Sequence, residues 1–204
     1  MNDQQYFSEQ PSSRWNTKSH ELEIRGHQVH LESSSGTFSP RGIDNGTAVL
    51  LKYAPQLPQQ GNFLDLGCGW GVLSVILGLE SPGARVWGVD VNPRAISSAK
   101  LNSLKNSTVN VTICRPTQVP ETVAFDVIWS NPPIRIGKKQ LHELLQEWLP
   151  RMKRNGSAWI VVAKKLGADS LETWLNNGGA GSLNVERFAS SRGYRLLKAE
   201  RRMS

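Results

Sequence analysis

The chain has 204 residues, and its 24 lysines and arginines outnumber its 17 aspartates and glutamates to give a formal net charge of +7. This length suits one domain with a sizeable core, and the ordinary apolar and charged fractions exclude a fibrous or disordered chain. The excess of positive charge favours a polyanionic partner such as nucleic acid.

The sequence shows no signal for export, membrane insertion or metal binding. The first ten residues, MNDQQYFSEQ, lack the basic and apolar regions of a secretory signal, and the longest apolar stretch, GVLSVILGL, is too short to span a bilayer. The only cysteines, Cys68 and Cys114, form no CxxC pair, and no histidines cluster at ligand spacing. We therefore expect a cytoplasmic protein without a disulfide framework, a metal or a membrane partner.

The N-terminal part of the chain differs in pattern from the rest. Residues 1–20 are polar, and the stretch that follows, ELEIRGHQVHLES, alternates apolar and polar residues on either side of Gly26. This alternation around a glycine predicts a β-hairpin. We assign residues 1–40 to an N-terminal appendage that contains the hairpin, and residues 41–204 to the main domain.

Strand and helix patterns alternate in the main domain. The run AVLLKYAP is helical in character and ends at Pro55. Five apolar segments then predict strands, separated by segments of helical periodicity. The strands are GNFLDLG, ARVWGVD, VNVTIC, FDVIWS and SAWIVVAK, and the helices are VLSVILGLE, PRAISSAKLNSLK and KKQLHELLQEWL. This order predicts an α/β fold with a mostly parallel sheet covered on both faces, and residues 184–202 predict a C-terminal antiparallel hairpin around Gly193.

The residues just after each strand are the candidates for ligand binding, because ligands of open parallel sheets bind at the carboxyl ends of the strands. The first strand is followed by a glycine loop, DLGCGWG (residues 65–71), which permits a tight turn and a close approach to a ligand. Asp90 ends the next strand, about twenty residues after the glycines, where a carboxylate can accept both hydroxyls of a ribose. The alternative role for Asp90 is to cap the helix that opens at Pro93.

The glycine spacing distinguishes between two possible cofactors, a dinucleotide and S-adenosylmethionine. The pattern is D-x-G-x-G-x-G, with Asp65 two residues before Gly67, and it lacks the third glycine of the G-x-G-x-x-G pattern of dinucleotide-binding folds. Asp65 would serve a pyrophosphate poorly, whereas it would not repel a sulfonium cofactor that carries an amino-acid tail. S-adenosylmethionine is therefore the predicted cofactor, and a nicotinamide dehydrogenase is disfavoured.

The stretch WSNPPIRIGKK (residues 129–139) follows the fourth strand. Two adjacent prolines exclude a helix start at Asn131 and hold the neighbouring carbonyls in place. The side-chain oxygen of Asn131 and the carbonyl of Pro132 can accept the two hydrogens of an exocyclic amine, so that the nitrogen lone pair points at a methyl group. The alternative is that the prolines only stiffen the exit from the strand.

A base inside a helix or stem reaches such a pocket only when it is unstacked or flipped out. Three cations close to the prolines, Arg135, Lys138 and Lys139, would then attract the phosphates of a nucleic acid. The stretch thus predicts an amino-group methyltransferase whose substrate is a nucleic acid.

Four motifs together resemble one family. They are the glycine loop FLDLGCGWGVLS, VDVNPRA after the second strand, SNPPIRIGK after the fourth, and the upstream SSGTFSPRGIDNGTAVLL. With them the chain resembles the ribosomal RNA guanine-N2 methyltransferases of the small-subunit methyltransferase C type, within the class I S-adenosylmethionine-dependent superfamily. The resemblance runs from about Tyr6 to the C-terminus and implies a Rossmann-like seven-stranded sheet. Within this family, the chain resembles the short members, which have a single domain.

The resemblance also implies roles for individual residues. Ile134 stands where DNA adenine and protein glutamine methyltransferases carry an aromatic residue that stacks on the target, which disfavours those substrates. The expected catalytic residues, which contact the target base, are Asn131, Pro132, Pro133 and Ile134. The expected cofactor-binding residues are Asp65, Gly67, Cys68, Gly69, Asp90, Val91 and Asn131.

We therefore predict methyl transfer from S-adenosylmethionine to an exocyclic amino group, namely guanine N2 of small-subunit ribosomal RNA, with ribosomal RNA or the small ribosomal subunit as partner. Two alternatives stay open. One is a DNA or protein amino-group methyltransferase that uses the same NPP motif. The other is a non-catalytic RNA-binding or ribosome-assembly factor on this scaffold, against which the presence of Asp65, Asp90 and Asn131 argues.

Overall fold

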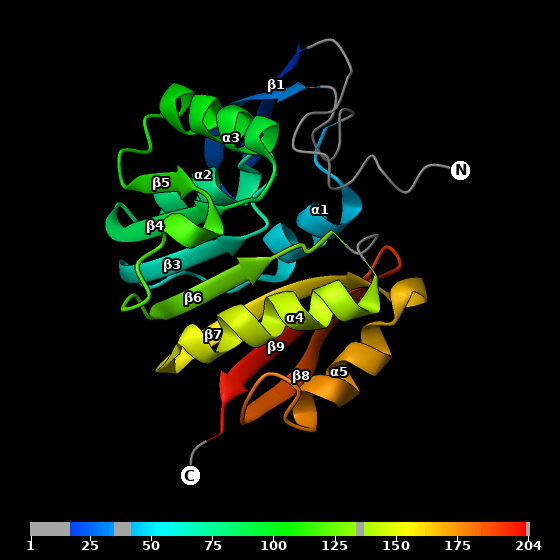
Figure 1. The fold of residues 1–204 in the computed structure, drawn as a ribbon. Coiled ribbons are helices and arrows are strands. Elements are labelled where there is room, and N and C mark those ends of the chain that lie inside the picture. The colour runs from blue at the N-terminus through cyan, green and yellow to red at the C-terminus, as the bar shows by residue number, and fades with distance from the viewer. Residues whose placement is uncertain (1–16, 35–41, 134–136, 203–204) are drawn as a thin grey trace.

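A single seven-stranded sheet forms the centre of the computed structural model, which describes residues 17–34, 42–133 and 137–202 (Figure 1). The strand order is β5-β4-β3-β6-β7-β9-β8, in which β9 pairs antiparallel with both β7 and β8 and all other pairs are parallel. The strands are β3 (Gln60–Leu66), β4 (Gly83–Val89), β5 (Val111–Cys114), β6 (Phe125–Ser130), β7 (Met152–Ala163), β8 (Leu183–Ser191) and β9 (Tyr194–Arg201).

Helices cover both faces of this sheet because alternate strand residues point to opposite sides. Phe63 packs with helices α1 and α2, whereas the next residue, Leu64, packs with α4 and α5. Helix α3 lies beside α2. The helices are α1 (Asn45–Tyr53), α2 (Val72–Glu80), α3 (Pro93–Lys105), α4 (Lys138–Trp148) and α5 (Ala168–Asn176), with short 3₁₀ turns η2 (Pro116–Gln118), η4 (Leu149–Arg151) and η5 (Lys164–Leu166).

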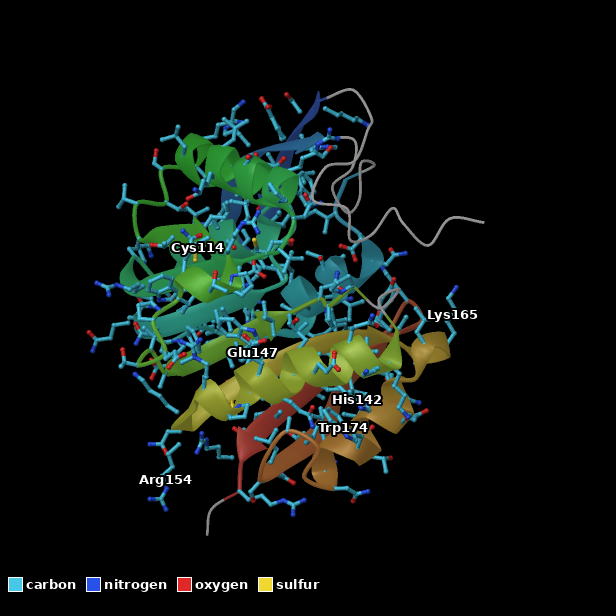
Figure 2. The ribbon with its side chains drawn as sticks, in the orientation of Figure 1. Cys114, His142, Glu147, Arg154, Lys165 and Trp174 are labelled. Carbon is cyan, nitrogen blue, oxygen red and sulfur yellow. The ribbon has the colours of Figure 1, made fainter. Side chains whose placement is uncertain are left out.

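Helices α4 and α5 contact each other through stacked rings. The rings of His142 and Trp174 lie 3.6 Å apart between their centroids and 8° from parallel, and Figure 2 shows them side by side between the two helices. Burial lowers the pKa of His142, with a smaller contribution from the positive charge of Lys138. His142 is therefore a packing residue between α4 and α5.

The predicted N-terminal hairpin is present as β1 (Thr17–Ile24) and β2 (His27–Ser34), which turn at Arg25 and Gly26. Its apolar residues Ile24, Val29 and Leu31 are buried in the same cluster as α1 and α2. The boundary proposed at residue 40 falls outside the described residues, so the division into 1–40 and 41–204 stays a prediction.

The α/β class, the mostly parallel sheet and the C-terminal antiparallel hairpin are confirmed. Two elements depart from the predicted pattern. Strand β7 begins at Met152, five residues before the predicted start at Ser157. The sequence did not indicate this earlier start, because Lys153, Arg154 and Asn155 are exposed and show no apolar alternation. Helix α5 was not predicted, although Leu171 and Leu175 lie one turn apart on its buried face.

One buried asparagine of α3 joins the hairpin to the main domain. The Asn102 side chain is fully buried, and its Oδ1 accepts from the N–H of Glu32 at 2.7 Å. Its Nδ2 donates to the carbonyls of Glu32 and Trp70 at 2.9 and 2.8 Å. The same side chain therefore holds the hairpin and the end of the glycine loop.

Asn102→Ala should lower the free energy of unfolding by about 2–4 kcal/mol, because it leaves two buried carbonyls and one N–H without partners. Urea denaturation of the two proteins measures this difference. Lys100→Ala, an exposed substitution on the same helix, is the control and should change stability by less than about 0.5 kcal/mol. Equal stability of Asn102→Ala and Lys100→Ala would contradict the anchoring role.

Candidate functional site

The carboxyl ends of the parallel strands lie level along one edge of the sheet, which we call the carboxyl edge. Its register residues are paired in sequence across the sheet: Cys114 with Val89, Val89 with Leu66, Leu66 with Ser130, and Ser130 with Ile160. The predicted site residues that follow β3, β4 and β6 therefore begin at the same level and on neighbouring strands.

The glycine loop turns sharply after β3. Gly67, Gly69 and Gly71 have positive φ angles of 78°, 55° and 89°, which other residues rarely adopt. A Cβ added to Gly69 would meet no atom within 4 Å, whereas one added to Gly71 would lie 2.9 Å from Cα of Ala99. Gly71 therefore serves the packing of α2 on α3, and Gly69 leaves its backbone open to a ligand.

Asp90 supports this loop from the end of β4. Its Oδ2 accepts from the N–H of Gly69 at 2.9 Å and its Oδ1 from the N–H of Asn92 at 2.8 Å. Burial raises the pKa of Asp90, and these N–H bonds oppose the rise. A carboxylate has about four acceptor positions, so two remain for ribose hydroxyls. The neighbouring Val91 is 57% exposed and offers an apolar surface at the same place.

The alternative role for Asp90, as the cap of α3, is not observed. The N-cap residue is Asn92, whose side chain accepts from the N–H of Arg94 at 2.9 Å. Asp90 instead accepts from the backbone of the residue that caps the helix. Its position is thereby fixed from both the glycine loop and the start of α3.

Asp65 is a fully buried acid beneath the glycine loop. Its Oδ2 accepts from Oγ of Ser74 at 2.6 Å, and its Oδ1 has no hydrogen-bond partner among the described residues. Burial raises the pKa of Asp65 to about 7, against the opposing effect of the Ser74 bonds. A buried acceptor without a partner carries a desolvation cost that a cationic ligand group would relieve.

Cys68 is a packing residue rather than a nucleophile. It is 7% exposed, packs against Ala99 and Ile113, and burial raises the pKa of its thiol well above the usual value. Its backbone N–H already donates to the carbonyl of Val89 at 2.9 Å. Its expected contact with the cofactor stays a prediction.

Asn131 is held by the start of helix α1. Its Nδ2 donates to Oδ1 of Asp44 at 2.9 Å and to Oγ1 of Thr47 at 3.0 Å. Thr47 Oγ1 donates in turn to Oδ2 of Asp44 at 2.7 Å. Because a carboxylate only accepts, the amide nitrogen must face Asp44, and the amide oxygen of Asn131 then accepts no hydrogen bond within the described part of the chain.

The residues that hold Asn131 come from the IDNGT stretch, which the sequence identified only as a family motif. Asp44 is the N-cap of α1 and accepts from the N–H groups of Gly46 and Thr47 at 2.8 and 3.1 Å. An Asp-x-Gly-Thr run before an apolar helical segment is a recognisable cap signal. No local pattern, however, indicates that this cap meets Asn131.

The prolines after Asn131 lie against the glycine loop. Pro132 is buried, and a Cβ on Gly67 would lie 3.7 Å from Cδ of Pro133. Ser130 Oγ donates to the carbonyl of Leu66 at 2.8 Å, so the ends of β6 and β3 are joined. The structure thus brings the predicted cofactor loop and the predicted catalytic loop into contact.

The remaining predicted site residues are less constrained. Ile134 and Arg135 lie outside the described residues. Lys138 and Lys139 are exposed at the start of α4, where Lys139 and Glu143 approach to 3.8 Å. Within residues 17–34, 42–133 and 137–202, no cluster of three or more His, Cys, Asp or Glu side chains could hold a metal ion, and no helix is long and apolar enough to cross a membrane.

The chain matches one family model and is similar in sequence to several known proteins. Residues 28–198 match the family model described as methyltransferase small domain. An uncharacterized protein of Bacillus subtilis, YbxB, is 30% identical over 203 residues, which cover 96% of this chain and 98% of that protein. A ribosomal RNA small subunit methyltransferase C of Shewanella amazonensis is 30% identical over 148 residues, which cover 71% of this chain and 42% of that protein.

Among solved structures, the 16S rRNA N2 G1207 methyltransferase of T. thermophilus, in complex with AdoMet and guanosine, has a TM-score of 0.74 at 22% identity. The match covers 95% of this chain and 52% of that one. At this identity the likeness shows the fold. The chain spans about half the length of this protein and of the Shewanella relative.

The buried Asp65 predicts a pH effect on stability. Because its pKa rises from 3.8 to about 7 on folding, the folded protein binds the extra proton between these values. Stability should therefore fall as the pH rises from about 4 to about 7 and then level off, by at most about 1.4 kcal/mol per pH unit. Asp65→Asn should flatten this fall and be the more stable protein at pH 8.

Urea denaturation of both proteins across this pH range gives the comparison. The difference between the two curves isolates Asp65, because every other titrating group is shared. Parallel curves would show that Asp65 keeps an ordinary pKa in the folded protein.

Proposed function

Because the chain belongs to the methyltransferase small domain family, we propose that it transfers the methyl group of S-adenosylmethionine to N2 of a guanine in small-subunit ribosomal RNA. Membership of this family confirms the resemblance predicted from the sequence, and with it the predicted cofactor. The chain is a methyltransferase that depends on S-adenosylmethionine. The target atom and the RNA are the parts that we propose.

The residues at the ends of β3 and β4 fit this cofactor. The unpartnered Oδ1 of Asp65 would satisfy the ammonium group of its amino-acid tail, and the free acceptor positions of Asp90 would take the ribose hydroxyls. Val91 would cover the base, while the backbone of Gly67, Cys68 and Gly69 lines the approach. When bound, the cofactor supplies a methyl group on a positively charged sulfur.

The single observation that carries the proposal is the fixed amide of Asn131. Asp44 and Thr47 take both hydrogens of its Nδ2, so that its oxygen is preorganised to accept from an exocyclic amine. The carbonyl of Pro132, whose ψ angle is restricted by the proline that follows, is the second acceptor. Two accepted hydrogens favour a tetrahedral nitrogen with its lone pair directed at the methyl group. The nitrogen becomes acidic once methylated, so its proton leaves to water without a strong base.

Guanine N2 and ribosomal RNA are supported by three kinds of evidence. The Shewanella relative is named as a ribosomal RNA methyltransferase, and the T. thermophilus neighbour is an N2 enzyme solved with guanosine. The net charge of +7 suits a phosphate-rich substrate. We propose the cytoplasm, where ribosomal subunits are assembled, as the location.

Transfer of a labelled methyl group to RNA, DNA and protein tests the proposal. Purified protein is incubated with labelled cofactor and with unmodified small-subunit RNA, assembled subunits, DNA or total protein. We expect label in RNA, recovered as N2-methylguanosine after digestion. Label in DNA or protein would contradict the substrate, and binding of the cofactor without any transfer would favour the non-catalytic alternative.

Asn131→Ala should cut the single-turnover rate by roughly a hundredfold or more, the scale for losing one preorganised polar contact, and leave cofactor affinity nearly unchanged. Asn131→Asp would replace the donating Nδ2 with a carboxylate oxygen that faces Asp44, so repulsion should displace the acceptor and this variant should also lose activity. Single-turnover transfer at saturating cofactor, run beside a thermal melt, gives both quantities. A folded Asn131→Ala enzyme with the wild-type rate would remove Asn131 from catalysis.

Gly46→Ala tests the positioning of Asn131 while Asn131, Asp44 and Thr47 all keep their side chains, although the added Cβ would also lie 3.0 Å from Oδ1 of Asp44. The added Cβ would lie 2.8 Å from Oδ1 and 3.1 Å from Nδ2 of Asn131, so the amide must move. Alanine favours the helix over glycine by about 1 kcal/mol, so the fold should persist. We expect the transfer rate to fall by about ten- to a hundredfold, the scale for a displaced reacting group. Cofactor affinity serves as the control, and an unchanged rate would show that the amide position is unimportant.

A further inference from the structure

Positive charge continues along the carboxyl edge on the side away from the cofactor-binding loops. Strand β7 runs past the register residue Ile160 to Ala163, and the turn η5 that follows carries Lys164 and Lys165. At about 3.3 Å per residue, the end of β7 lies roughly 10 Å beyond the level at which β6 ends, and the two lysines follow it. They form a raised border beside the loop that carries Asn131.

The turn between β8 and β9 adds a further cation to this border. The N–H of Lys164 donates to the carbonyl of Gly193 at 2.8 Å, which joins η5 to the turn, and Arg192 is exposed beside it. A hydrogen bond from Ser191 and then the positive charge of Lys52 lower the pKa of Tyr53, and Arg192 contributes in the same direction. We call the four exposed cations the basic rim: Lys52, Lys164, Lys165 and Arg192.

The acids nearest to the basic rim are already paired with other residues. Asp169, at the start of α5, pairs with Arg195 and lies 2.8 Å from Arg187, and Glu172 lies 3.1 Å from Arg187. No described acidic side chain forms an ion pair with a cation of the rim. Among the described residues, the charge of the rim is therefore not compensated by an ion pair.

The carboxyl edge is thus divided by charge. The acids Asp65 and Asp90 lie at the ends of β3 and β4, the basic rim lies on α1, on η5 and in the turn between β8 and β9, and Asn131 directly follows β6. A substrate that reaches Asn131 from the rim side meets cations, and it avoids the two acids. The ring of Tyr53, with Nζ of Lys52 5.1 Å from its centroid, offers a stacking surface on the same side.

We propose that the basic rim binds the phosphate backbone of the RNA strand that flanks the target nucleotide, an inference that rests on the proposed function. The target base must leave its stack to reach Asn131, so the flanking strand is locally single-stranded. Exposed cations without acidic partners are free to exchange solvent ions for phosphates. The rim thereby sets the direction from which RNA enters the site.

A pair of double variants with equal loss of charge tests this inference. The rim pair is Lys164→Gln with Lys165→Gln. The control pair is Arg85→Gln with Arg154→Gln, two exposed arginines near the amino ends of β4 and β7. Figure 2 shows Lys165 and Arg154 at opposite ends of the sheet. Binding of a single-stranded RNA segment from the substrate is measured by fluorescence anisotropy over a range of salt concentrations.

The rim pair should lower the slope of log affinity against log salt by about 1.4, and weaken binding roughly tenfold at about 0.15 M salt, whereas the control pair should change neither by much. Adding Arg192→Asn, which suits the positive φ of that residue, should lower the slope further. The single-turnover rate at saturating RNA and the thermal melt should match those of the unmodified protein.

Three outcomes would overturn the inference, and they differ in what they imply for the proposed function. If the rim pair binds RNA with the wild-type affinity and slope while the unmodified protein methylates RNA, the rim assignment fails and the proposed function stands. If the unmodified protein neither methylates RNA nor binds it in a salt-dependent way, both fail. If the rim pair and the control pair lose RNA affinity equally, the effect depends only on net charge, and the proposed role of the rim is also wrong.

Discussion

The amide of Asn131 is the contact on which the candidate site depends. It joins the end of β6 to the cap of α1, because one nitrogen donates to Asp44 at 2.9 Å and to Thr47 at 3.0 Å. The same carboxylate caps the helix, so the start of α1 and the orientation of the amide are fixed together. A helix cap thereby fixes the orientation of the amide, which under the proposed function is the acceptor for the target amine.

The parallel sheet determines what surrounds this acceptor. Since β3, β4 and β6 end in register, the glycine loop, Asp90 and Asn131 lie side by side although they are far apart in the chain. Burial raises the pKa of both acids, that of Asp65 to about 7. Charge is therefore distributed along one edge, with buried acids on the cofactor side and exposed cations on the β7 and β9 side. A positively charged cofactor and a negatively charged substrate would meet at β6.

Much of this arrangement could be predicted from local sequence. The bounds of α2, α3 and β6 match the predicted segments, because their periodicity and the cap before Pro93 are local signals. The positions of the glycine loop and the NPP stretch at strand ends were likewise predicted, because each directly follows an apolar segment. Contacts between distant segments could not be predicted: Asp44 and Asn131 are 87 positions apart. The early start of β7 was missed because its residues 153–155 are polar, and α5 was missed because only Ala168, Leu171 and Leu175 are buried on it.

Mass spectrometry of ribosomal RNA from a strain that lacks this gene tests the proposed function most directly. Small-subunit RNA from the deletion strain should lack one N2-methylguanosine found in the parent strain. The wild-type gene should restore it, and the Asn131→Ala gene should not, although its product accumulates to the same level. Identical modified nucleosides in the parent and deletion strains would contradict methyl transfer to guanine N2 of ribosomal RNA.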